Sequence, residues 1–202
     1  MSKLVRSLDD EICRAEARDM GLLFFNGQTQ NGVVIGGGTY GEICDIGSNF
    51  VAKIPRALME KYRHFPSWEE LRFAQEVYAG GVSCPKPYGL YGVPVITEDS
   101  GRDLVRVYPG IVMEKIQGVD GNLINLEDTG SALMQFGEEM RKLDDLGFIT
   151  EDHYVYGPGR IKNAMWDSTK KKLYLIDFAE LKEKSWRIER RVEESMRERW
   201  GN

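Results

Sequence analysis

The chain has 202 residues, of which 42% are hydrophobic and 29% are charged, and its formal net charge is −5. This is an ordinary globular composition, and the length suffices for one or two compact domains with hydrophobic cores. The negative charge provides no overall basic field for nucleic acid, and no apolar run approaches the ~20 residues that span a bilayer. The composition therefore argues against a nucleic-acid partner and against a membrane span.

Targeting and redox signals point to a cytoplasmic protein. The N-terminal residues 1–20 are polar and acidic and contain no apolar signal-peptide core. The three cysteines, Cys13, Cys44 and Cys84, are scattered and fit neither a disulfide framework nor a clustered zinc site. Free cysteines of this kind are usually small buried residues in a reducing compartment.

The first half of the chain predicts a small β-sheet with one inserted helix. A short helix is predicted at 7–20, and residues 32–54 predict strands joined by turns rich in glycine, serine and asparagine. Residues 67–79 predict an amphipathic helix with its own N-cap. Further strands are predicted at 93–99 and 111–118, and prolines favour an extended segment before the first of them.

The second half predicts more helix. Residues 131–146 carry an apolar stripe at helical spacing, and residues 184–200 predict a charged helix. Between them lie two predicted short strands, at 163–167 and 172–179, joined by a polar turn. A segment rich in Gly, Asn and Asp at 118–125 indicates the boundary between the two halves.

Three glycines, Gly36, Gly38 and Gly41, follow the first apolar run in the spacing G-x-G-x-x-G. A dinucleotide-binding loop with this spacing opens a helix, whereas a strand is predicted to follow here. Glycine allows the backbone to approach a phosphate without a Cβ in the way. A glycine-rich hairpin turn explains the same residues equally well.

The order of features along the chain resembles the protein kinase-like superfamily, which includes protein kinases and the aminoglycoside- and choline-type small-molecule kinases. The resemblance covers about residues 32–180, and it rests on sequential order rather than on a single motif. The features in order are a glycine-rich hairpin, the lysine of VAK, a helix carrying glutamates, VMEKI, a long amphipathic helix, GFITED, an asparagine and LIDFA.

The resemblance implies an α+β, two-lobed protein kinase-like fold over residues 1–202. It has an antiparallel β N-lobe with one helix at about 1–117 and a reduced helical C-lobe at about 118–202. Only residues 178–202 follow Asp177, and we expect them to leave no room for an activation segment, an Ala-Pro-Glu motif and further helices.

In length and layout the chain is similar to minimal effector kinases that bacteria inject into host cells by type III secretion. These include the kind that phosphorylates the ninety-kilodalton heat-shock chaperone. An effector of this kind would act in the host cytosol on a host protein.

The resemblance also implies ATP and Mg²⁺ as cofactors, and it assigns roles to residues of the first half. Gly36, Gly38 and Gly41 would cover the phosphates, and Lys53 would orient them. Glu70 is the preferred carboxylate partner of Lys53. Glu69 and Glu76 are the alternatives, and a surface strand lysine is the plainer interpretation of Lys53.

The VMEKI strand would form the hinge that binds adenine through backbone groups. Met113 would be the gatekeeper side chain, and Glu114 and Ile116 would lie beside the base. A plain buried strand followed by a turn explains the same residue types.

Asn163 and Asp177 would hold the metal, since an apolar strand ending in Asp-Phe places a carboxylate at a sheet edge. Asp152, in LGFITED, matches the family's catalytic aspartate. Extra residues separate Asp152 from Asn163, so Asp152 can face the γ-phosphate only if this loop bulges out and returns. A base of this kind is typically worth about 10²–10⁴-fold in rate.

Two departures from the family pattern concern the same region. Thr150 stands where the family has a histidine, and Ala179 stands where it usually has glycine. We interpret His153 as structural and Arg160 as a solvated loop residue.

The predicted function is ATP- and Mg²⁺-dependent transfer of a γ-phosphate to a Ser or Thr hydroxyl of a protein. One alternative is a small-molecule kinase, for which Tyr154 and Tyr156 are the local candidates for a substrate pocket. The other is a catalytically dead nucleotide-binding module that works by interaction, which the displaced asparagine and the missing histidine favour.

Overall fold

The fold is mixed α and β, with antiparallel sheets. The computed structural model describes residues 15, 17–19, 23–25, 30–38, 41–55, 67–99, 102–157 and 159–191. They fall into two compact units, one drawn from Met1–Arg72 and Lys86–Lys115 and the other from Phe73–Pro85 and Ile116–Asn202. Within the described part of the chain, no helix combines the length and the apolar character that a membrane crossing needs.

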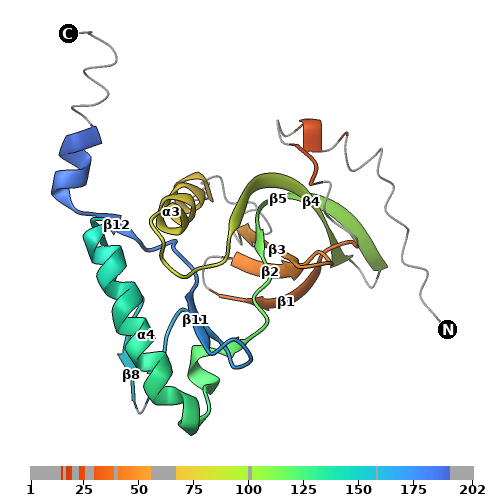
Figure 1. The fold of residues 1–202 in the computed structure, drawn as a ribbon. Helices are drawn as coiled ribbons and strands as arrows, with labels where there is room; N and C mark the ends of the chain where they lie inside the picture. The colour runs from red at the N-terminus through yellow and green to blue at the C-terminus, as the bar shows by residue number, and fades with distance from the viewer. Residues whose placement is uncertain are drawn as a thin grey trace, which may run out of the picture. The chain divides into compact units, whose positions relative to one another are not determined.

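A five-stranded antiparallel sheet in the order β1-β2-β3-β5-β4 forms the first unit (Figure 1). Its strands are β1 (Val33–Gly37), β2 (Gly41–Asp45), β3 (Phe50–Pro55), β4 (Pro87–Asp99) and β5 (Arg102–Glu114). Strand β4 begins at Pro87, before the predicted start at residue 93. Strand β5 begins at Arg102, before the predicted start at residue 111, and ends at Glu114, so residues 115–118 of the predicted strand are not a strand. The prolines in this part of the chain are tolerated because β4 lies at the edge of the sheet, where a residue without an N–H donor need not break the ladder.

Helix α3 (Ser67–Ala79) has the bounds that the sequence predicted. Its residues up to Arg72 belong to the first unit and the rest to the second. The helix ends where Gly81 adopts a φ of 81°, and the N–H of Val82 donates to the carbonyl of Val77 over 3.2 Å. Glycine is the residue that adopts this left-handed closing geometry without strain.

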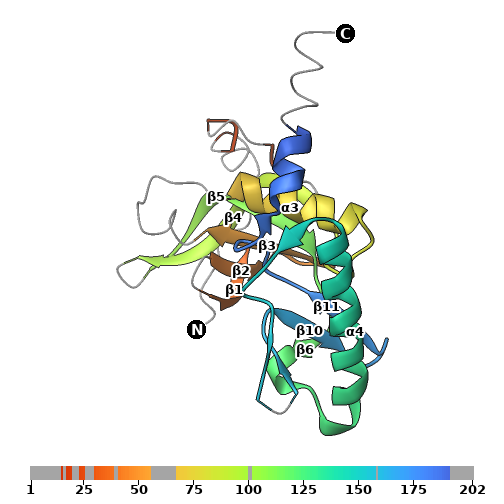
Figure 2. The same ribbon diagram turned by 90° about the vertical axis from the view of Figure 1, so that its left-hand side faces the viewer.

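The second unit combines one long helix with short strands (Figure 2). Its elements are β6 (Val119–Asp120), the 3₁₀ turn η1 (Gly121–Leu123), α4 (Leu126–Asp145), β7 (Phe148–Ile149), β8 (Val155–Tyr156), β9 (Arg160–Ile161), β10 (Ala164–Asp167), β11 (Lys172–Leu175) and β12 (Lys182–Glu183). Strands β11, β10 and β6 form one sheet, β12 pairs with β7, and β8 pairs with β9.

Helix α4 begins at Leu126, five residues before the predicted start, so the prediction of 131–146 was wrong at this end. Acidic side chains in the first turn suit the positive end of the helix dipole. One of them, Asp128, is buried and accepts hydrogen bonds from the indole of Trp166 over 2.9 Å and from Lys171 over 2.7 Å. These tertiary contacts hold the first turn in place despite Gly130.

Both terminal helices predicted from the sequence extend outside the described residues. Residues 15 and 17–19 of the predicted helix at 7–20 are helical. Residues 185–191 of the predicted helix at 184–200 are helical, and 192–200 lie outside the described residues.

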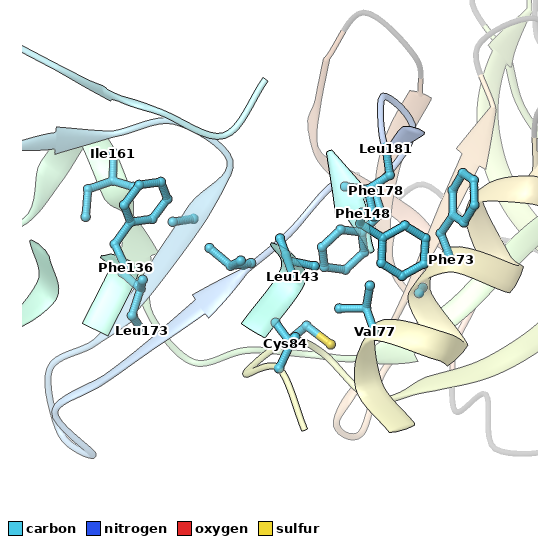
Figure 3. Packing of buried hydrophobic residues seen from close by; sticks show 14 of the residues in the cluster. Phe73, Val77, Cys84, Phe136, Leu143, Phe148, Ile161, Leu173, Phe178 and Leu181 are labelled. Carbon is cyan, nitrogen blue, oxygen red and sulfur yellow. The ribbon is translucent and has the colours of Figure 1, made fainter. Parts of the chain in front are cut away.

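The core of the second unit packs one face of α4 against β10, β11 and the segments around β7. The side chains labelled in Figure 3 run from Ile161, Phe136 and Leu173 at one end to Phe73, Phe148, Phe178 and Leu181 at the other, with Leu143 between them. Phe148 and Phe178 matter most for the site, because they flank the segments that carry Asp152 and Asp177.

Replacing Leu143 with alanine should lower the free energy of unfolding by about 2–5 kcal/mol, because it opens a cavity in this core. Leu143 is 1% exposed and Met134, on the same helix, is 64% exposed. Met134→Ala is therefore the matched control, with an expected change within about 0.5 kcal/mol. Urea unfolding followed by circular dichroism measures both. Equal effects of the two changes would contradict the described packing of α4.

Candidate active site

Lys53 and Glu70 form a nearly buried ion pair within the first unit. Lys53 lies in β3 and Glu70 in α3, and Nζ lies 2.6 Å from Oε1, with side chains 7% and 11% exposed. The alternatives pair with arginines instead: Glu69 with Arg72 and Glu76 with Arg187. The structure therefore selects Glu70 among the three glutamates, and it places an ammonium group at a defined point beside β2.

The three glycines of the hairpin are not equivalent. At Gly41 a Cβ would lie 2.7 Å from the carbonyl oxygen of Ile54 and 3.4 Å from Cε of Lys53, so the close approach of β3 requires glycine. No atom of the described residues comes within 4 Å of a Cβ built at Gly36 or Gly38, and neither has a positive φ. Packing within the described chain thus explains Gly41 but not the other two.

The predicted hinge residues differ in the backbone groups that they leave for a ligand. Met113 is half-buried in β5. The N–H of Glu114 donates to the carbonyl of Lys86 over 3.0 Å, so it is already engaged. Ile116, in the second unit, makes no backbone hydrogen bond to any described residue.

The chain between Asp152 and Asn163 bulges out and returns, as the prediction for Asp152 required. Strands β8 and β9 pair as a small hairpin, and the N–H of Lys162 donates to the carbonyl of Tyr154 over 3.0 Å. The Asn163 amide nitrogen then donates to Asp152 Oδ2 over 2.7 Å and to its carbonyl over 3.1 Å. Two side chains eleven positions apart therefore lie in contact.

Lys162 is a site residue that the sequence analysis missed. Its Nζ is hydrogen-bonded to Asp152 Oδ1 and lies 5.4 Å from the ring centroid of Tyr154. Spacing alone did not show which residue of the insertion points back at Asp152. The sequence feature that could have identified Lys162 is its position directly before Asn163, the candidate metal ligand.

The charge state of Asp152 follows from these contacts. Burial acts to raise its pKa, but hydrogen bonds from Lys162 and Asn163 outweigh burial and hold the pKa below the usual 3.8. The hydrogen bond to Asp152 in turn raises the pKa of Lys162. Asp152 is therefore an ionised acceptor at neutral pH, suited to orienting a hydroxyl and taking its proton late in a reaction.

His153 is buried and holds two segments together. Its Nε2 lies 2.9 Å from the carbonyl oxygen of Ile176, and its Nδ1 lies 2.9 Å from Oγ1 of Thr150. The N–H of Asp152 donates to the same Thr150 oxygen over 3.2 Å. A carbonyl only accepts, so Nε2 carries the hydrogen, and the Thr150 hydroxyl donates to Nδ1.

The imidazole of His153 is neutral near pH 7. Burial lowers the pKa of His153, and the positive charge of Lys162 lowers it further. The hydrogen bond to the Ile176 carbonyl and the negative charges of Asp177 and Asp152 act to raise the pKa, but burial outweighs them. The ring also stacks on Phe178, with centroids 5.8 Å apart and planes inclined by 13°.

Asn163 and Asp177 share an uncommon backbone conformation. Their φ angles are 55° and 63°, a region that few residues other than glycine adopt, although Asn and Asp tolerate it best. The N–H of Ile176 donates to the carbonyl of Asn163 over 2.9 Å, which ties the two positions together. Strained backbone of this kind gathers at functional sites.

Asn163 and Asp177 carry the kind of oxygen ligands that Mg²⁺ prefers. The carboxylate of Asp152 only accepts, so Asn163 turns its amide nitrogen toward it and leaves Oδ1 for a metal. The described residues contain no group of three His, Cys, Asp or Glu side chains that could hold a metal by themselves. A nucleotide-bound Mg²⁺ needs only one or two protein oxygens, because phosphates and water supply the others.

Comparison with models of known protein families finds none that matches the chain, and comparison with curated proteins finds no similar sequence.

Gly41→Ala should lower the free energy of unfolding by about 1–3 kcal/mol, because the new Cβ overlaps a backbone oxygen that cannot move freely. Gly36→Ala and Gly38→Ala should change it by less than about 0.5 kcal/mol. Urea unfolding of the three variants measures the difference. Destabilisation by Gly36→Ala as large as by Gly41→Ala would show that packing requires the whole motif.

The free energy of unfolding should decrease as the pH falls below the usual histidine pKa of 6.5. In that range the unfolded chain binds a proton that the buried His153 does not, so stability rises with pH. His153→Gln should remove this dependence. The chain's second histidine, His64, is present in both proteins, so the difference between their pH profiles isolates His153. An unchanged profile would rule out a buried neutral imidazole.

Proposed function

We propose that the protein is a two-lobed, kinase-like phosphotransferase that moves the γ-phosphate of ATP, with Mg²⁺, to a Ser or Thr hydroxyl of a protein substrate. The observation that carries the proposal is the return of the β8–β9 hairpin, which brings Asn163 and Lys162 onto Asp152. The combination supplies a proton acceptor, a cation and a metal-binding oxygen at one place, which phosphoryl transfer requires.

Each residue has a defined part in the reaction. The acceptor hydroxyl donates a hydrogen bond to Asp152, its oxygen forms the new bond to phosphorus, and its proton passes to the carboxylate. The bond from the γ-phosphorus to the bridging oxygen breaks, and ADP leaves. Lys162, already at Asp152, neutralises charge on the transferred phosphoryl group. Catalysis comes mainly from positioning and charge neutralisation.

Three groups of residues are assigned to the nucleotide in this proposal. Lys53, held by Glu70, neutralises phosphate oxygens of ATP. Asn163 Oδ1 and the carboxylate of Asp177 would hold Mg²⁺, which would neutralise phosphate charge when bound. The backbone of Ile116 binds the base.

A protein acceptor is favoured over a small cationic substrate such as choline. Tyr154 and Tyr156 are exposed, and the hydroxyl of Tyr156 donates to Asn122 Oδ1 over 2.6 Å. The ammonium of Lys162 lies at the ring of Tyr154, so this ring already interacts with one cation, which would repel a second. An exposed surface beside Asp152 suits a polypeptide segment better than an enclosed pocket.

The experiment is transfer of labelled γ-phosphate from ATP in the presence of Mg²⁺. Acceptors are the protein itself, a eukaryotic cell lysate, the purified ninety-kilodalton chaperone that the resemblance suggests, and a panel of aminoglycosides and choline. Label on protein Ser or Thr supports the proposal. Label on small molecules alone indicates a small-molecule kinase, and no transfer to any acceptor indicates a binding module.

Asp152→Asn should lower the transfer rate by about 10²–10⁴-fold, because the amide cannot take the proton. The matched control is Glu151→Gln, which removes the neighbouring carboxylate, 82% exposed and paired at 3.5 Å with Lys182. This control should retain the wild-type rate. Full activity of Asp152→Asn in an active preparation would exclude Asp152 as the base.

A further inference from the structure

We propose that His153 is a positioning residue that sets the orientation of the peptide group before Asp177 and joins it to the loop carrying Asp152. This inference rests on the proposed function, and it names the residue that places the candidate metal ligand relative to the candidate base.

The hydrogen bonds of Ile176 are the evidence on the metal-binding side. Its N–H donates to the carbonyl of Asn163 over 2.9 Å, and its carbonyl accepts from Nε2 of His153 over 2.9 Å. That carbonyl belongs to the peptide group that joins Ile176 to Asp177. Rotation of this peptide plane is what changes the φ of Asp177, which is 63°. His153 therefore holds a backbone angle that has a conformational cost.

The other nitrogen of the same ring connects to the base. Nδ1 of His153 lies 2.9 Å from Thr150 Oγ1, and this oxygen accepts from the N–H of Asp152 over 3.2 Å. One neutral tautomer, with the hydrogen on Nε2, satisfies every bond in the chain from Asp152 to Ile176. The ring is buried and stacked on Phe178, so it has little freedom to adopt another arrangement.

The β-ladder between β7 and β12 closes the other end of these segments. Ile149 pairs with Lys182, so the stretch that contains Asp152 and the stretch that contains Asp177 are joined on the far side as well. His153 joins the two stretches through Ile176, the residue before Asp177. Loss of this link leaves Asp177 with fewer constraints while the core residues Phe148 and Phe178 stay in place.

This arrangement changes the meaning of a departure noted in the sequence. Thr150 stands where the resemblance predicted a histidine, and the absence of that histidine favoured a catalytically inactive module. In the structure, a histidine three residues later bonds the Thr150 hydroxyl and reaches the strand end itself. The missing histidine is therefore no evidence against activity.

Two substitutions separate positioning from folding. His153→Phe keeps a ring that can stack on Phe178 but has no donor for Ile176, whereas His153→Gln restores an N–H donor without the ring. Outer-shell partners of metal ligands are typically worth about 10–100-fold in metal affinity. His153→Phe should therefore raise the Mg²⁺ concentration for half-maximal transfer by about tenfold or more, and His153→Gln should recover most of this loss.

The control is Trp166→Phe, which removes a buried hydrogen bond to Asp128 in the same unit. It should lower thermal stability while leaving the Mg²⁺ requirement unchanged. The shift in melting temperature produced by ADP with Mg²⁺ provides a readout without catalysis, and it should be diminished only in His153→Phe.

The ring state is tested directly by ¹⁵N NMR of the wild-type imidazole, which should show one neutral tautomer with the hydrogen on Nε2. A different tautomer, or an unchanged Mg²⁺ requirement in His153→Phe, overturns the positioning role while the kinase proposal stands. Absence of both transfer and Mg²⁺-dependent nucleotide stabilisation in the wild type overturns the proposed function and this inference with it.

Discussion

The contact between the Asn163 amide and the Asp152 carboxylate is the constraint on which the rest of the candidate site depends. It closes a loop of eleven positions and brings Lys162 to the same carboxylate. It also decides which atom of Asn163 faces outward, because a carboxylate can only accept. Without this contact, Asp152 would be one acidic residue in a surface loop and Asn163 a turn residue with a strained backbone.

Lys53 in the first unit and His153 in the second are each buried with a bonding partner. Lys53 is nearly inaccessible to solvent, and an unpaired ammonium there would be costly, so its burial depends on Glu70. His153 is buried as a neutral ring with both nitrogens bonded. Each group therefore holds a fixed position, and preorganised charges and hydrogen-bond donors act more strongly than mobile ones when a reaction moves charge.

The short segments that carry the carboxylates derive their rigidity from the core. Strands β7 and β12 are two residues long each, too short to be stable alone. Phe148 and Phe178, which flank the two segments, belong to the same buried cluster as Leu143 of α4. The edge of the packed cluster thus fixes the polar side chains, and this explains how so few strand residues can carry a site.

Local patterns in the sequence predicted the bounds of α3 and the hairpin of β2 and β3, because period and turn residues are properties of neighbouring residues. The candidates Asp152, Asn163 and Asp177 were chosen by resemblance to the kinase-like superfamily, which rests on the order of motifs along the chain. The early start of α4 needed the bonds from Asp128 to Trp166 and Lys171, which lie far away in sequence. Likewise, the pairing of Lys162 with Asp152 and the link from His153 to Ile176 exist only once β8–β9 has folded back. Contacts between distant segments decide these features, and no local pattern of residues encodes which side chain will point inward.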